Sequence, residues 1–104
     1  MAHGWEYAIV TQDSEREKID VKYAGPDKVA HHDAHKGALD RMVGAMGGKE
    51  WELVSVTASW RADSHYVTQF FFKRPHDGHN HGADELAGLA KDASWSAAMD
   101  QRSP

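Results

Sequence analysis

The chain has 104 residues, which is enough for one small domain with an extension and too few for several domains. Hydrophobic residues make up 40% and charged residues 27%, a balance typical of a folded globular protein. The 12 basic and 16 acidic residues give a net charge of −4 with no basic stripe, which argues against nucleic-acid binding. The lack of cysteine excludes disulfides and thiolate metal sites.

The sequence contains no run of about 18 apolar residues, so it predicts no membrane span. Its first ten residues, MAHGWEYAIV, lack the charged and long apolar regions of a signal peptide, and we expect a cytoplasmic protein. A domain this short builds a thin core and exposes much of its surface. A second copy or another protein is therefore expected to cover part of it.

Residues 5–11, WEYAIVT, predict the first strand because they are rich in aromatic and β-branched side chains. Alternation along a strand places Trp5 and Tyr7 on one face and Ala8 and Val10 on the other. Both faces of this strand are therefore partly apolar.

The next segment, residues 12–25, is mostly polar and charged, and within it residues 19–24 could form a brief strand or sheet edge. Gly25-Pro26-Asp27 is a turn signal. We interpret the run from there to His35 as a loop or an irregular helix.

A short amphipathic helix is predicted to begin near Asp33, whose carboxylate can cap free backbone N–H groups. It is predicted to end at Gly47-Gly48, because glycine accepts the left-handed conformation found at helix C-termini. Its buried stripe follows the spacing i, i+3, i+4 and i+7 and consists of Leu39, Met42, Val43 and Met46.

Two further strands are predicted at residues 51–60 and 66–74, joined by a hairpin turn at residues 61–64 and closed by Pro75. The aromatic residues expected in the core are Trp5, Trp51, Phe70 and Phe72. Those expected at an interface, where tryptophan and tyrosine are enriched, are Trp60, Tyr66 and Trp95.

These elements predict an α+β fold, a small β-α-β-β antiparallel sheet with one helix packed on one face, over residues 1–75. One helix covers only one face, and the other face still carries apolar side chains. We therefore expect sheet-to-sheet or edge-to-edge association into a dimer or a higher homo-oligomer, with a homodimer as the simplest closed solution.

Three segments, GWEYAIV, LDRMVGAMGGKEWELVSV and FFFKRP, resemble a family of short bacterial proteins known as domain of unknown function 4177. The family pattern is W-E-Y, then L-N-x-L-G-x-x-G-W-E-L-V-S, then F-K-R, and the match covers about residues 4–75. Here Met42 and Met46 replace leucines of the family's helix, and Lys49-Glu50 precede Trp51 where the family has glycine. The resemblance implies a small β-α-β-β fold and carries no established activity.

The resemblance ends before residues 76–82, HDGHNHG, which predict a histidine-rich linker, and residues 83–104, which predict an amphipathic C-terminal helix or tail. A short alanine-rich helix is marginal alone in water, so we expect it to dock on a protein partner. The residues expected to bind that partner are Leu86, Leu89, Trp95 and Met99.

Two histidine clusters are candidates for a transition-metal site. The first, H-H-x-x-H, consists of His31, His32 and His35, and on a helix His31 and His35 would share a face. The second, H-x-x-H-x-H, consists of His76, His79 and His81. Imidazole suits zinc, nickel or copper, but neither spacing includes a defined second ligand pair, so solvated loop histidines are the alternative.

No spaced catalytic signature is present: Asp63-Ser64-His65 falls in the predicted hairpin turn, and Gly47-Gly48 is a helix stop without the G-x-x-x-x-G-K pattern of a phosphate loop. The sequence therefore predicts no catalytic residue and no organic cofactor.

We favour a non-enzymatic accessory or interaction protein that self-associates through its sheet and docks a partner by its C-terminal tail. The alternative is histidine-based metal binding for storage, sensing or delivery. A third hypothesis, a small-ligand or catalytic site between protomers, requires an apolar pocket with a titratable group.

Overall fold

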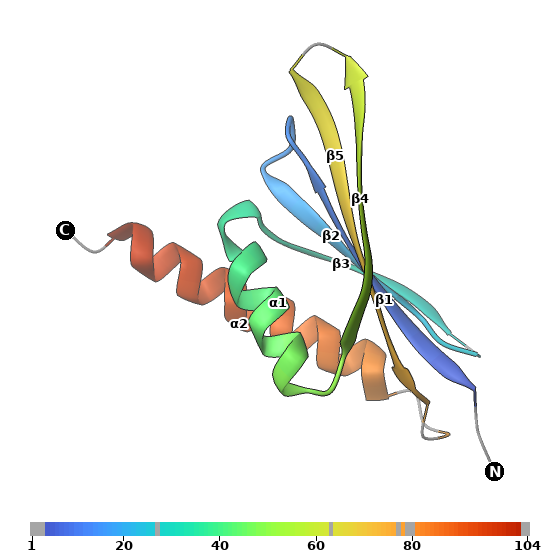
Figure 1. Ribbon diagram of the computed structural model, residues 1–104. Coiled ribbons are helices and arrows are strands. Elements are labelled where there is room, and N and C mark those ends of the chain that lie inside the picture. Colours follow the sequence, from blue (N-terminus) through green and yellow to red (C-terminus); the bar gives the residue numbers. More distant parts are fainter. Residues whose placement is uncertain (1–3, 27, 63, 77, 79–80, 103–104) are drawn as a thin grey trace.

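The computed structural model describes residues 4–26, 28–62, 64–76, 78 and 81–102, with side-chain environments given up to residue 95 and for Met99. The fold is α+β, with one five-stranded antiparallel sheet and two α-helices, as Figure 1 shows. The elements in chain order are β1 (Trp5–Asp13), β2 (Lys18–Ala24), β3 (Val29–His35), the 3-10 turn η1 (Lys36–Ala38), α1 (Leu39–Gly48), β4 (Glu52–Ala62), β5 (His65–Pro75) and α2 (His81–Arg102).

The strands lie in the order β3-β2-β1-β5-β4. The first three strands pair as successive antiparallel neighbours. After α1, the chain enters the sheet at its far edge as β4, and β5 returns between β4 and β1. The two edges of the sheet are therefore β3 and β4.

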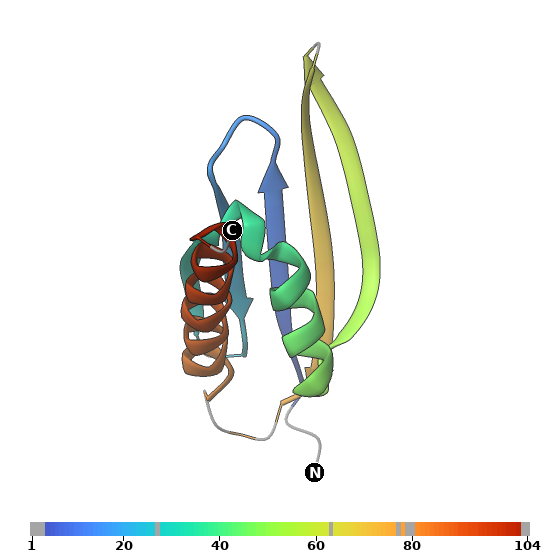
Figure 2. The same cartoon turned by 90° about the vertical axis from the view of Figure 1, so that its left-hand side faces the viewer.

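Both helices lie on the same face of the sheet (Figure 2). α2 packs against β2, β3 and α1, and it covers the part of the sheet built by the first three strands. The core lies between this helical layer and the sheet. Its largest fully buried side chains are Val10, Ile19, Val21, Tyr23, Met42, Met46 and Leu86.

The predicted face alternation of the first strand is confirmed, but one core assignment is wrong. Ala8 and Val10 are buried under the helices, whereas Trp5 and Tyr7 lie on the opposite, open face and are nearly half exposed. Trp51 is buried as predicted. A tryptophan at the start of a strand follows the strand's alternation, and position 5 falls on the outer face.

The loop or irregular helix predicted before His35 is wrong, because residues 29–35 form β3. This strand pairs with β2 along its whole length, from Lys18 opposite His35 to Ala24 opposite Val29. Its sequence, VAHHDAH, has little intrinsic preference for a strand. Pairing with β2 and packing against α2 outweigh that local preference.

The predicted helix start is wrong for the same reason, since Asp33 lies in β3 opposite Asp20. The chain leaves the strand through η1, where the His35 side chain accepts a hydrogen bond from the Gly37 amide at 3.0 Å. The first α-helix then begins at Leu39.

The predicted stripe of this helix is confirmed, with Met42 and Met46 fully buried. Leu39 and Val43 are partly buried against the same core. The left-handed residue that turns the chain after the helix is Glu50, with a φ of 69°, and not one of the two glycines. Gly47 and Gly48 remain helical.

The C-terminal helix is part of the domain. Sequence patterning predicts one helix on the sheet, and the structure has two, because α2 buries Ala83, Leu86, Ala90 and Ala93 against the sheet and α1. Within the described part of the chain, no helix is long and apolar enough to cross a membrane.

Candidate functional site

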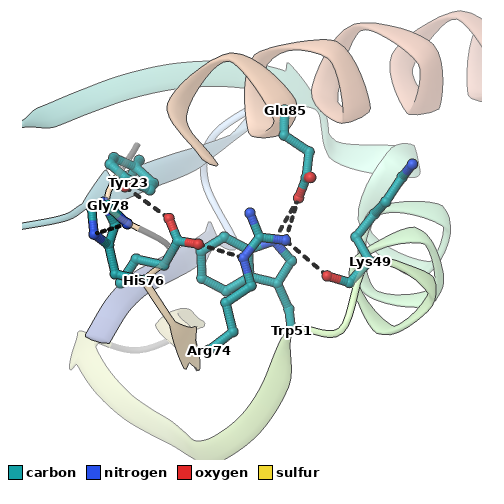
Figure 3. Close-up of polar contacts among 8 residues, drawn as sticks. Tyr23, Lys49, Trp51, Arg74, His76, Gly78 and Glu85 are labelled. Atoms are coloured by element: carbon teal, nitrogen blue, oxygen red, sulfur yellow. Dashed lines mark hydrogen bonds and ion pairs between the residues drawn. The ribbon is translucent and has the colours of Figure 1, made fainter. Parts of the chain in front are cut away.

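A polar cluster centred on Arg74 of β5 joins the sheet to both helices (Figure 3). The Arg74 Nε donates to Glu6 Oε2 at 2.6 Å, and its Nη1 donates to Glu85 Oε1 at 2.7 Å and to the Lys49 carbonyl at 2.8 Å. The guanidinium carbon lies 4.2 Å from the centre of the Trp51 ring. One cation thereby contacts β1, α2, the end of α1 and the start of β4.

The two carboxylates of this cluster are held by further donors. Glu6 is only 4% exposed, and its Oε1 accepts a hydrogen bond from the Tyr23 hydroxyl, with 2.8 Å between the two oxygens. Glu85 accepts the Trp51 Nε1–H at 2.9 Å. A Cβ atom at Gly82 would collide with Glu6 Oε1 and the Tyr23 ring, so glycine lets α2 begin directly above this buried carboxylate.

The electrostatics of the cluster keep Arg74 charged. Burial lowers the pKa of Arg74, but its hydrogen bonds to Glu6 and Glu85 outweigh that effect and hold the pKa above the ordinary value. Beside the cluster is an open hollow of about 480 Å³, lined by Glu6, Gly48, Lys49, Glu50, Arg74, Pro75, His81 and Glu85. The acidic groups that face Arg74 are already engaged as its partners, which is the arrangement of a structural ion-pair network.

A second ionic contact lies near the end of β1. His65 Nε2 is 2.9 Å from Asp13 Oδ1, and its Nδ1 is 3.7 Å from Glu15 Oε2. The pKa of Asp13 is lowered, chiefly because its carboxylate accepts a hydrogen bond from the Glu15 backbone amide. Desolvation raises this pKa, and the contact with His65 lowers it further. These contacts join β1 and β5 at this end of the sheet.

The first histidine cluster does not form the predicted chelating pair. His31 and His35 lie on strand β3, where a four-residue separation spans about 13 Å, instead of one turn of a helix. His31 Nδ1 lies 3.4 Å from Asp20, and His35 caps η1. His32 points to the opposite face of the strand, and its Nε2 is buried without a hydrogen-bond partner among the described residues.

The second histidine cluster is described only in part, because His79 lies outside the described residues. His76 is buried, and its Nδ1 accepts a hydrogen bond from the Gly78 amide at 3.1 Å. His81 is the first residue of α2. Among the described residues, no group of three or more histidine or acidic side chains is placed to hold a metal ion.

The four predicted partner-binding residues of the tail fall into two classes. Leu86 is fully buried in this chain's own core, and Leu89 packs against that core. Trp95 and Met99 are 66% and 45% exposed. The N-terminal half of α2 therefore packs in the core of this chain, and its C-terminal end exposes apolar side chains to solvent.

Exposed apolar side chains also lie on the β4–β5 hairpin, which projects beyond the helical layer at the top of Figure 1. Every residue of the edge strand β4 is exposed. Leu53, Val54 and Val56 are about half exposed, and Trp60 is 73% exposed. Near the tip, the rings of Trp60 and Tyr66 meet edge to face with centroids 5.3 Å apart.

The faces of β4 follow from its pairing with β5. Leu53 lies opposite the buried Phe72, and Val56, Ala58 and Trp60 continue on this helix-side face. The register shifts between Leu53 and Ser55 and again after Trp60. On the open face, β4 presents only small polar side chains between these shifts, namely Ser55, Thr57 and Ser59.

The charge pattern of this strand is also distinctive. From Leu53 to Trp60 the sequence is LVSVTASW, without a charged residue. Glu52 precedes this run and Arg61 follows it. Sequence patterning found the strand and its aromatic tip, but it did not show that β4 would be an edge, because strand order is set by tertiary pairing.

Comparison of the chain with known proteins finds no matching family model, no matching curated protein and no matching solved structure. The resemblance to domain of unknown function 4177 therefore stays a prediction.

Proposed function

We propose that this chain is a non-enzymatic assembly protein that binds a second copy of itself through the β4 edge. The observation that carries the proposal is an edge strand of 11 residues, each of them exposed, with eight consecutive uncharged positions. An edge strand presents a row of unpaired backbone N–H and C=O groups that another strand can satisfy. A second copy of β4 offers the same groups in return.

The contrast between the two edges of the sheet supports this assignment. Edge strands that stay unpaired are usually short, charged or covered. β3 has seven residues, carries Asp33 and packs against α2, so it has these protections. β4 is longer, uncharged in its central part and lies largely beyond the helical layer.

The side chains of β4 add an apolar contribution to backbone pairing. Trp60 and Tyr66 are residue types enriched at the energetic centres of interfaces. Leu53 and Val56 lie on the same face as Trp60. Pairing by one strand edge is isologous, because the same patch is used on both subunits, and it gives a closed homodimer.

A protein partner bound at the C-terminal end of α2 is a second, separate proposal. Trp95 and Met99 are four residues apart on this helix, share one side of it and are exposed. Leu86 and Leu89 are excluded from that contact by their place in or against the core. This surface fits the accessory role that we expect from the sequence.

The assembly proposal is tested with Val56→Lys, which places a cation in the uncharged run. Val56 is half exposed, so the free energy of unfolding of the monomer should change by about 0.5 kcal/mol or less. Self-association should weaken by about tenfold or more, because a charge must be buried at the paired edge. Analytical ultracentrifugation measures the dissociation constant.

The matched control is Val29→Lys, at an exposed valine of the other edge strand. It should leave self-association unchanged. Equal weakening by both substitutions would contradict the assignment to β4, and a wild-type chain that stays at 11.6 kDa at all concentrations would refute the proposal.

A further inference from the structure

We propose that two copies pair β4 with β4 in antiparallel orientation, with the two-fold axis at Thr57 and with Glu52 of each subunit at the same end of the paired strands as Arg61 of the partner subunit. This inference rests on the proposed function and specifies the geometry of the same surface. It is carried by three independent features of β4, namely its end charges, its length and the position of its bulge.

The end charges determine the orientation. Glu52 and Arg61 lie at opposite ends of the uncharged run. An antiparallel copy places each carboxylate beside a guanidinium, twice per dimer, whereas a parallel copy places like charges together. Opposite charges on facing strands stabilise a sheet, and like charges directly opposite destabilise it.

The length of the strand places the axis. β4 runs from Glu52 to Ala62, and Thr57 is its middle residue. An axis there pairs Glu52 with Ala62 of the partner subunit at both ends, with Val54 and Arg61 as the extra residues of the two register shifts, while a shift along the strand leaves one end unpaired. Moving the axis to Val56 would place Ser59, instead of Ala62, opposite Glu52 of the partner subunit and would move Arg61 away from that carboxylate.

The bulge makes this register consistent on both faces. On the open face, Thr57 meets its own copy and Ser55 meets Ser59 of the partner subunit; on the helix side, Val56 meets Ala58. Because the register shifts between Leu53 and Ser55, Val54 is the extra residue and Leu53 comes opposite Trp60. Leu53 and Trp60 both lie on the helix-side face. In this register, the two side chains of each facing pair therefore lie on the same face of the sheet.

This geometry gives a partner to the most exposed of the large hydrophobic side chains described in the hairpin. Trp60, which is 73% exposed, would lie over Leu53 of the partner subunit, which is 46% exposed. The two helical layers would lie on one face of a continuous ten-stranded sheet, because a two-fold axis between antiparallel edges is normal to the sheet. The apolar helix-side surfaces of the two hairpins would meet between these layers.

The experiment uses introduced cysteines, which are unambiguous because the chain has none. Directly opposed residues of antiparallel strands have Cα atoms about 4.5–5.5 Å apart, within the range of a disulfide. Thr57→Cys should therefore form a covalent dimer under mild oxidation. Ser55→Cys alone should not, since its copies would be offset by four residues, about 13 Å.

A mixture of Ser55→Cys and Ser59→Cys chains provides the matched control. This mixture should cross-link as a heterodimer, although neither variant cross-links with itself. If the wild type dimerises but Ser55→Cys alone cross-links, or Thr57→Cys does not, the register is refuted while the proposed function stands. A wild-type chain that remains monomeric would refute both.

Charge exchange tests the orientation without any covalent bond. Glu52→Arg and Arg61→Glu should each weaken dimerisation, by roughly tenfold, because each places like charges beside one another at both ends of the paired strands. The double variant should restore the wild-type dissociation constant. Double-variant binding that is no tighter than that of the single variants would overturn the antiparallel pairing.

Discussion

The Arg74 side chain connects four separate segments of the domain. Its guanidinium holds the carboxylates of Glu6 and Glu85, which come from β1 and α2. Glu6 lies between two exposed aromatic residues in sequence, yet alternation places it on the same face as Ala8. The sequence thus contained the signal for a buried carboxylate, but not the identity of its partner, because Arg74 is 68 residues away.

Replacing Arg74 with methionine should destabilise the protein by about 3 kcal/mol, because it leaves the buried carboxylate of Glu6 without its cation. Lys73→Met is the matched control. The Lys73 ammonium lies 4.5 Å from the Trp5 ring on the open face, and its loss should cost about 1 kcal/mol or less. Urea denaturation gives both free energies of unfolding. Equal losses for the two variants would contradict the central role of Arg74.

At the scale of elements, α2 shows why a correct helix prediction can still give an incomplete fold. Its helical pattern is visible in the sequence, but its buried stripe consists of three alanines and Leu86. Small side chains give weak evidence of burial, and here they allow the helix to lie close to β2 and β3. Sequence patterning does not predict β3 as a strand, because its histidines and Asp33 have little intrinsic strand preference.

Leu86→Ala tests whether this helix belongs to the folded domain. Leu86 is fully buried, so the substitution should lower the free energy of unfolding by about 2–5 kcal/mol. Trp95→Ala, which removes a larger but exposed side chain of the same helix, should change it by about 0.5 kcal/mol or less. Thermal unfolding followed by circular dichroism compares them. A stability loss for Trp95→Ala as large as that for Leu86→Ala would contradict the observed burial of α2.

At the scale of the whole molecule, composition and periodicity predicted an α+β antiparallel fold and an apolar surface left over by the helical layer. They did not predict β3, whose residues have little intrinsic strand preference, or the order that makes β4 an edge, because that order depends on the pairing of β1 with β5, which joins residues far apart in sequence. The open face also keeps Trp5 and Tyr7 half exposed.

The most direct test of self-pairing by β4 is amide hydrogen exchange measured at increasing protein concentration. Pairing with a second copy predicts that the outward-facing amides of residues 53–61 become protected as the dimer forms. The outward amides of β3, at the other edge, should exchange at a rate that does not depend on concentration. Exchange along β4 that stays equally fast at all concentrations, in a chain that nevertheless dimerises, would contradict the account.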